Sequence, residues 1–262
     1  MQVFVLWSFL NYFHIIWEQL HIELFQKKGD YMQKHIFFDL DDTLIKCSGY
    51  FYDVEDVVTK KILKYNEKYT YSEIRQKFNE KQYENLEQHG YGPQNFECSL
   101  MQVAYDIIGY DFFKDDIQGF IKKSASILYN SDIELIDGAK EAVEYLYDKG
   151  YELSIITKGM EDVQKRRVEA LSIKKYFADY TIVKHKTKSD YEEILKKYNL
   201  KPEDCYMIGN SPKGDINEAK KAGFNTVYIP NEHTWSYEDE KVDDALPKTN
   251  VLKNIKEIKN IF

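Results

Sequence analysis

Two aspartates follow a short apolar run, at a position where their carboxylates could take part in catalysis or bind a metal. Asp39 and Asp41 lie two positions apart at the end of the short apolar run HIFFDL, residues 35–40. Paired carboxylates at such a place can bind a hard cation through their oxygens, or act as a nucleophile and a general acid. Aspartates also end strands and cap turns, and we assign only that simpler role to Asp42. Asp39 and Asp41 are therefore the first candidate catalytic residues.

A hydroxyl group ends a second apolar run. Thr157, Lys158 and Gly159 follow the run SII. A hydroxyl and free backbone N–H groups at this place could hold a phosphate oxygen.

A third group consists of lysines. They are either a solvated run of charges, or one of them is the cation that binds a negatively charged substrate. These lysines are Lys184, Lys186 and Lys188.

A fourth polar group follows the apolar run CYMI. The segment GNSPKGD, residues 209–215, supplies oxygen ligands at Asn210 and Asp215. The four groups together contain carboxylates, a hydroxyl, an ammonium and a possible metal site. This is the set of groups that phosphoryl transfer requires.

Strands and helices alternate in the part of the chain that carries these groups. Strands separated by helices predict right-handed crossovers and a parallel sheet that is covered on both faces. In such a sheet, ligands bind outside the carboxyl ends of the strands, where all four groups stand. The predicted fold class is therefore α/β, with a Rossmann-like, doubly wound parallel sheet. The expected strands are 35–40, 152–157, 180–183, 205–209 and 226–230, and the expected helices are 139–149, 161–171, 190–198 and 216–222.

A long helical block interrupts this alternation. Residues 47–131 show helical periodicity without strand signals. We therefore predict an all-helical cap domain inserted into a core made of residues 32–46 and 132–262. The stretch GYGPQNF, residues 90–96, breaks the block in the middle. It is either a simple interhelical turn or a cap loop that reaches the substrate.

With these motifs, the sequence resembles the haloacid dehalogenase superfamily of phosphatases. The motifs of that superfamily are DxDxT, a Ser or Thr that ends the second strand, a Lys, and an acidic loop such as GDxxxxD. The matching segments are FFDLDDT (37–43), IITKG (155–159), VKHKTKSDY (183–191) and IGNSPKGD (208–215). They occur in family order, and the helical insertion lies between the first and second motifs, as in members with a helical cap. The resemblance implies a haloacid dehalogenase-like core.

The resemblance also implies roles for the first two groups. Asp39 would attack phosphorus and form an aspartyl-phosphate. Asp41 would protonate the leaving oxygen and then activate water for the second step. Thr157, with Lys158 and Gly159, would bind the phosphoryl group. The dehalogenases of the superfamily lack an acid at the position of Asp41 and use no metal, so carbon–halogen cleavage is disfavoured.

The same resemblance selects one of the lysines. Lys186 would offset the negative charge of Asp39 and of the transferred group. Lys186 followed by Tyr191 resembles the family spacing, and Lys184 remains the alternative.

The resemblance implies Mg²⁺ as the cofactor. The ion would lie between Asp39, the backbone carbonyl of Asp41, and the loop with Asn210 and Asp215. Many members carry Asp where this chain has Asn210. A neutral amide still binds Mg²⁺ through its oxygen but removes one negative charge. Either Asp215 therefore takes the main acidic role, or the affinity for the metal falls.

Composition restricts the partners of the protein. The chain of 262 residues has 36 Lys plus Arg against 44 Asp plus Glu, a net charge of −8. This balance provides no general basic field for a nucleic acid backbone, so we expect no nucleic acid partner. Cys47, Cys98 and Cys205 have no spacing typical of a disulfide framework or a zinc site. A cytoplasmic location is the simpler expectation.

Residues 1–31 form an N-terminal extension. Its apolar part is shorter than the ~20 residues of a membrane-spanning helix, and it lacks the features of a secretory signal. We expect Met32 to be the true start, with the extension not translated. The alternatives are a weak membrane anchor in residues 1–28 and an amphipathic helix that packs on the core.

The sequence thus predicts a Mg²⁺-dependent phosphatase that acts on a small phosphorylated metabolite, with a cap that closes over the site. Nucleoside monophosphates, sugar phosphates and phosphoglycolate all remain open as substrates. A phosphomutase would use the same Asp39 and Asp41 but return the phosphoryl group to its substrate. A non-catalytic phosphate-binding protein would retain the fold alone. The oligomeric state is left open.

Overall fold

The computed structural model describes residues 34–262, except 131, 233–234, 236 and 244–248. The expectations about residues 1–31 therefore lie outside the described residues. Among the residues that are described, no helix is both long enough and apolar enough to cross a bilayer.

A six-stranded sheet carries the candidate site. Its strand order is β3-β2-β1-β4-β5-β6, and every neighbouring pair is parallel. The predicted α/β class with a doubly wound parallel sheet is confirmed. The chain winds outward in both directions from β1, so the end of β1 is a topological switch point. The strands are β1 (His35–Phe38), β2 (Glu152–Lys158), β3 (Asp179–Val183), β4 (Cys205–Gly209), β5 (Asn225–Tyr228) and β6 (Asn250–Val251).

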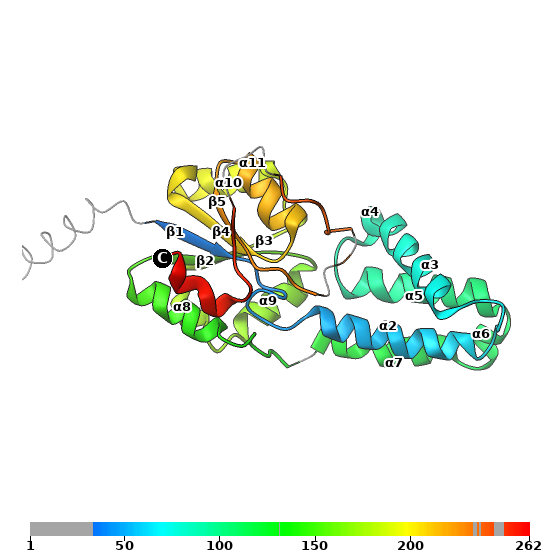
Figure 1. Ribbon diagram of the computed structural model, residues 1–262. Coiled ribbons are helices and arrows are strands. Elements are labelled where there is room, and N and C mark those ends of the chain that lie inside the picture. The colour runs from blue at the N-terminus through cyan, green and yellow to red at the C-terminus, as the bar shows by residue number, and fades with distance from the viewer. Residues whose placement is uncertain (1–33, 131, 233–234, 236, 244–248) are drawn as a thin grey trace, which may run out of the picture. The chain divides into compact units, whose positions relative to one another are not determined.

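Helices cover both faces of this sheet (Figure 1). On one face, α8 (Ala139–Asp148), α9 (Glu161–Glu169) and the C-terminal turn η4 (Ile255–Asn260) pack against apolar side chains of the strands. On the other face lie α10 (Lys188–Tyr198) and α11 (Glu218–Lys221). All four residues of β1 are buried, which explains why three of them are apolar. The fourth, His35, is hydrogen-bonded to the hydroxyl of Ser154 at 2.9 Å. Short turns connect these elements: η1 (Lys174–Tyr176), η2 (Pro202–Asp204) and η3 (Pro212–Asn217).

The block between β1 and β2 is helical, as predicted. Its members have an apolar cluster of their own, in which Phe78, Phe96 and Leu100 are buried. We call this block the cap and the sheet with its flanking helices the core; the cut points at 46/47 and 131/132 remain predictions. The cap helices are α2 (Ser48–Leu63), α3 (Tyr71–Glu84), α4 (Leu86–His89), α5 (Pro93–Ile108), α6 (Asp111–Lys114) and α7 (Ile117–Asn130).

The C-terminal segment contains two short elements. It first adds the short edge strand β6 beside β5, and only then forms η4. Ile255 and Ile258 are buried against the core. A two-residue strand leaves no periodicity of its own in the sequence, which is why it was not predicted.

Candidate active site

Asp39 lies at the switch point, directly after β1. Its backbone N–H donates to the carbonyl of Ile208 at 2.9 Å, which continues the pairing of β1 with β4. This bond places the Asp39 side chain above the carboxyl ends of the central strands. Only 6% of Asp39 is exposed to solvent. The local fold therefore presents a carboxylate in a nearly dry position.

Lys186 joins two carboxylates at this position. Its ammonium group contacts Asp39 Oδ1 and lies 2.6 Å from Asp215 Oδ1. The other oxygen of Asp215 accepts a hydrogen bond from the backbone N–H of Ser211 at 2.9 Å. We call Asp39, Lys186 and Asp215 the catalytic cluster. Lys184, the alternative cation in the sequence, is exposed, whereas Lys186 is buried.

Burial and neighbouring charges both act on the pKa values of Asp39 and Lys186. Burial, and next the charge of Asp215, raises the pKa of Asp39 to about 7, against the attraction of Lys186. Burial lowers the pKa of Lys186, but the charges of Asp215 and Asp39 outweigh it, so this pKa lies above its usual range. Lys186 is therefore held as a cation. Its charge opposes the effect of burial on the pKa of Asp39.

Gly209 permits the close approach of Asp215. A Cβ atom at position 209 would lie 2.3 Å from a carboxylate oxygen of Asp215. Any side chain at this strand end would therefore displace Asp215 from Lys186. This requirement explains the glycine at the start of the fourth motif.

Three oxygens, from Asp39, Asn210 and the backbone of Asp41, suit a cation. The position of the Asn210 side-chain oxygen lies 3.2 Å from Asp39 Oδ2 and 3.1 Å from the backbone carbonyl oxygen of Asp41. In this orientation the amide oxygen faces only acceptors, an arrangement that a cation between them would explain. Without a cation the turned amide is favoured, because its nitrogen then donates to both oxygens. Adjacent oxygens around octahedral Mg²⁺ lie about 3 Å apart. The spacing and the donor set therefore fit Mg²⁺.

This candidate metal site differs from the predicted ligand set in one respect. It combines a carboxylate, an amide and a backbone carbonyl; across the described residues, no group of three His, Cys, Asp or Glu side chains could hold a metal. Asp215 has one oxygen on Lys186 and the other on Ser211. Asp215 as a direct metal ligand remains a prediction.

Thr157 ends β2 with an unused hydroxyl. The residue is 1% exposed, and its Oγ1 is buried without a hydrogen-bond partner among the described residues. Buried hydroxyls are rarely left unsatisfied, so this atom suits an oxygen of a bound group. The predicted role in phosphoryl binding has this observation behind it and remains a prediction.

Lys158 and Gly159 face different surroundings. The Lys158 ammonium lies 2.6 Å from Glu238 Oε1 and 4.4 Å from the centre of the Tyr91 ring. The backbone N–H of Gly159 donates to the carbonyl of Val183 at 3.4 Å. Both groups thus already have partners in the protein. Their predicted contact with the phosphoryl group requires those partners to be exchanged.

Asp41 faces away from the catalytic cluster. Its carboxylate accepts from Arg167 Nη1 at 2.8 Å and from Gln164 Nε2 at 2.7 Å. Both partners lie on α9, on the same side of that helix. Its backbone carbonyl points toward Asn210 instead. Asp41 can therefore serve the candidate metal site with its backbone and a leaving group with its side chain.

Arg167 is a candidate site residue that could not be recognised from a motif in the sequence. It is buried, and besides Asp41 it donates to Cys47 Sγ at 3.3 Å and to the carbonyl of Leu128 at 3.3 Å. Cys47 precedes the first cap helix and Leu128 lies in the last one. One guanidinium group thus contacts both connections of the cap and the candidate acid. The available signal was the rarity of arginine in this lysine-rich chain.

Asp42 has a structural role, as expected. It has a φ of 62°, in the left-handed region. Its carboxylate accepts from the backbone N–H groups of Cys47 and Ser48 at 3.0 Å each. These are free N–H groups at the beginning of α2, so Asp42 holds the first turn of the cap.

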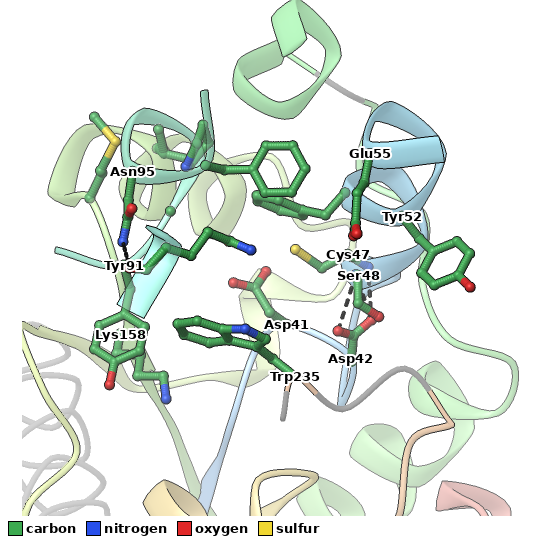
Figure 2. A pocket seen from close by; sticks show the side chains of 18 of the residues that line it. Asp41, Asp42, Cys47, Ser48, Tyr52, Glu55, Tyr91, Asn95, Lys158 and Trp235 are labelled. Carbon is green, nitrogen blue, oxygen red and sulfur yellow. Dashed lines mark hydrogen bonds between the residues drawn. The ribbon is translucent and has the colours of Figure 1, made fainter. Parts of the chain in front are cut away.

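A cavity of about 510 Å³ extends from Asp41 to the cap. Figure 2 shows Tyr91 and Lys158 beside one another, with Asp41 and Trp235 close by and Ser48 on α2. The loop with Tyr91 and Gly92 lines this cavity, so the stretch 90–96 reaches it. We call this space the cap cavity. Its lining combines core residues near the candidate acid with side chains of α2, α3 and α5.

Solved structures support the fold. A haloacid dehalogenase-like hydrolase from Xanthomonas campestris superposes with a TM-score of 0.71 at 23% identity, covering 87% of this chain and 89% of that one. A putative hydrolase of the same kind from Bacillus subtilis, bound to magnesium, superposes with a TM-score of 0.57 at 17% identity. That match covers 87% of this chain and 98% of the other.

Relatives of known activity are distant. A glyceraldehyde 3-phosphate phosphatase from Pyrococcus furiosus is 25% identical, over 75% of this chain and 80% of its own. One of the same name from Methanothermobacter thermautotrophicus is 24% identical, over 88% of this chain and 100% of its own. A pyrimidine 5′-nucleotidase from Streptococcus pneumoniae is 24% identical, over 85% of this chain and 98% of its own.

The model of one protein family, the haloacid dehalogenase-like hydrolases, matches residues 36–229. This range begins in β1 and ends just after β5, so it contains the cap, the catalytic cluster and the candidate metal site. The chain therefore belongs to the haloacid dehalogenase-like hydrolase family.

Proposed function

We propose that this protein is a Mg²⁺-dependent phosphomonoesterase that works through an aspartyl-phosphate on Asp39. The observation that carries the proposal is the catalytic cluster, in which buried Lys186 joins Asp39 to Asp215. The distant phosphatase relatives support small phosphorylated metabolites as substrates, among them glyceraldehyde 3-phosphate and pyrimidine nucleotides. A cytoplasmic location belongs to the proposal on the sequence argument alone.

In the first step, a carboxylate oxygen of Asp39 forms a bond to phosphorus while the bond from phosphorus to the leaving oxygen breaks. Asp41 donates its proton to that leaving oxygen, because its side chain points into the cap cavity. Thr157 donates its unused hydroxyl to a phosphoryl oxygen. Lys186 stabilises the negative charge of the transferring group beside Asp39.

In the second step, Asp41 takes a proton from water, and the water oxygen attacks phosphorus. The bond between phosphorus and the Asp39 oxygen then breaks, which restores the carboxylate and releases inorganic phosphate. Mg²⁺, held by Asp39, Asn210 and the carbonyl of Asp41, would offset negative charge when bound. The acid of the first step thus becomes the base of the second.

The test is phosphate release from p-nitrophenyl phosphate and a set of natural phosphomonoesters, with and without Mg²⁺. We expect turnover that requires Mg²⁺ and is lost in Asp39→Asn. A folded protein with Mg²⁺ that releases no phosphate from any of these substrates would contradict the proposal. If the enzyme releases no phosphate but, in the presence of a bisphosphate, transfers the phosphoryl group back to its substrate, the phosphomutase alternative would be supported instead.

A further inference from the structure

We propose that the cap cavity binds an uncharged nucleoside, so that the substrate is a nucleoside 5′-monophosphate with its base against the cap. This inference rests on the proposed phosphatase function and specifies its substrate class. It is carried by three features of the cavity, namely its paired charges, its unused hydrogen-bonding groups and its aromatic walls.

The charges in the cap cavity disfavour a second anionic group on the substrate. Each cation in the described lining has a carboxylate partner. Arg75 lies 2.7 Å from Glu55, Lys158 lies 2.6 Å from Glu238, and Arg167 lies 2.8 Å from Asp41. A carboxylate or second phosphate on the leaving group would find Arg75 and Lys158 already paired. Arg167, whose partner Asp41 is the proposed acid, is buried and also donates to Cys47 and Leu128. The cavity therefore favours a neutral leaving group over that of phosphoglycolate or a bisphosphate.

The pair Glu55 and Arg75 is itself well satisfied. The guanidinium group makes two hydrogen bonds to Glu55, at 2.7 and 3.4 Å, and a third to the hydroxyl of Tyr52 at 2.9 Å. It also lies 4.5 Å from the centre of the Tyr52 ring. Because the Arg75 guanidinium group already has these partners, it forms a rigid part of the cavity lining. The neutral side chains beside it are then the groups that recognise the substrate.

Unused amide groups line the same helix. Asn79 and Gln82 follow Arg75 at positions i+4 and i+7 of α3, so the three side chains lie on one face of the helix and all line the cavity. Both amides are half-buried, and neither side chain hydrogen-bonds to another described residue. Together these groups offer both donors and acceptors to a ligand.

This pattern matches the edge of a nucleobase. Nucleobases present a donor and an acceptor side by side, and the amide of Asn or Gln can pair with both at once. A sugar hydroxyl can use the same amides singly. A three-carbon leaving group without a base would leave most of these half-buried amide groups without a hydrogen bond to the ligand.

Aromatic side chains supply flat apolar walls. Phe51 lines the cavity and packs edge-on against Phe96, with 5.0 Å between the ring centres. Across the lining, Tyr91 packs edge-on against Trp235 at 6.1 Å. Phe51 is half-buried, so part of its ring is available to a ligand. Stacking of one base on an aromatic ring raises affinity by roughly 5- to 150-fold.

The size of the cavity also favours a nucleoside over a smaller leaving group. Its volume of about 510 Å³ lies in the range of sites that hold ligands with a ring system, roughly 300–1,000 Å³. A triose would fill a small part of this space and would contact neither wall fully. Asp41, Asn79 and Gln82 line the same cavity, so a ligand that fills it contacts both the candidate acid and the amides of α3.

The experiment compares kcat/KM for four substrates of one enzyme with Mg²⁺ bound: uridine 5′-monophosphate, ribose 5-phosphate, glyceraldehyde 3-phosphate and phosphoglycolate. We expect uridine 5′-monophosphate to exceed ribose 5-phosphate by about 10- to 100-fold, because the two differ only in the base. In Gln82→Ala and in Asn79→Ala we expect this ratio to fall by about 5- to 20-fold. A misfolded variant lowers both rates together and leaves the ratio unchanged.

Gln76→Ala is the matched control, because Gln76 lies on the same helix but is exposed and donates to Glu80. It should not change the ratio. Equal kcat/KM for uridine 5′-monophosphate and ribose 5-phosphate would overturn the inference, as would phosphoglycolate as the best substrate. If p-nitrophenyl phosphate is hydrolysed in those cases, the phosphatase function stands and only the substrate class is wrong. If it is not hydrolysed, the proposed function itself fails.

Discussion

The catalytic cluster and the cap cavity meet at Asp41 but are built in different ways. In the catalytic cluster, Asp39, Lys186 and Asp215 are almost fully buried, and every charge contacts an opposite charge. In the cap cavity, the amides of Asn79 and Gln82 are half-buried and have no hydrogen-bond partner among the described residues. In the first region the protein itself pairs the charges, whereas in the second it leaves the amides available to a ligand.

This difference follows from what holds each region in place. The catalytic cluster stands on strand ends whose positions are set by the ladder of parallel strands, so its geometry is fixed before substrate binds. The cap cavity is lined by helix faces, where one side chain can be exchanged without moving the backbone. The same core chemistry can therefore serve different substrates through changes in the cap.

The largest expected effect lies in the catalytic cluster. Asp39→Asn removes the nucleophile, so phosphate release should fall by roughly 10⁴-fold or more. The matched control is Asp42→Asn, because asparagine tolerates the left-handed backbone and its oxygen can still accept from Cys47 and Ser48. Steady-state phosphate release measures both variants. Equal losses in the two would show that the assay follows folding and not chemistry.

Lys186→Met should destabilise the protein as well as inactivate it. The variant leaves Asp39 and Asp215 buried without their shared cation, so we expect a loss of about 3–5 kcal/mol in the free energy of unfolding. Urea denaturation, followed by circular dichroism, measures this value. The control is Lys184→Met, since Lys184 is exposed and should contribute little. A stable, active Lys186→Met would contradict the assignment and return attention to Lys184.

Arg167→Met tests the connection between the two regions. Without its guanidinium group, Asp41 loses one of two orienting contacts, and both cap connections lose a partner. We expect kcat for an alkyl phosphate to fall by about 100-fold. The loss for p-nitrophenyl phosphate should be smaller in the first step, because its leaving group needs little protonation. Lys165→Met is the control, as Lys165 is exposed on the same helix. Equal losses for both substrates would indicate a structural role only.

Asn210→Asp has the smallest expected effect and sharpens the metal assignment. It adds a carboxylate beside Asp39 and the carbonyl of Asp41, so the Mg²⁺ concentration for half-maximal activity should fall by about 3- to 10-fold. Titration of activity with Mg²⁺ measures this change. An unchanged or raised Mg²⁺ requirement would exclude Asn210 as a ligand. Asp215 would then be the residue to test next.

Much of the fold and of the catalytic cluster could be predicted from local patterns. The apolar runs before Asp39, Thr157 and Asn210 are strands because both faces of the sheet are buried, and polar residues follow where these strands end. The edge strand β6 could not be predicted, because a two-residue pairing depends on where the chain returns and not on its own composition.

The sequence by itself determined the parallel sheet and the helical insertion, and it made Asp39 a candidate, because strand periodicity and strand-end chemistry are local properties. The choice of Lys186 over Lys184 as a candidate came from the resemblance to the family. The tertiary structure decided which side chains meet across the fold. It paired Lys158 with Glu238 and placed Arg167 on Asp41, 126 positions away in the chain. Such contacts depend on which face each helix presents after packing. No spacing along the sequence encodes that choice, so the lining of the cap cavity became visible only in three dimensions.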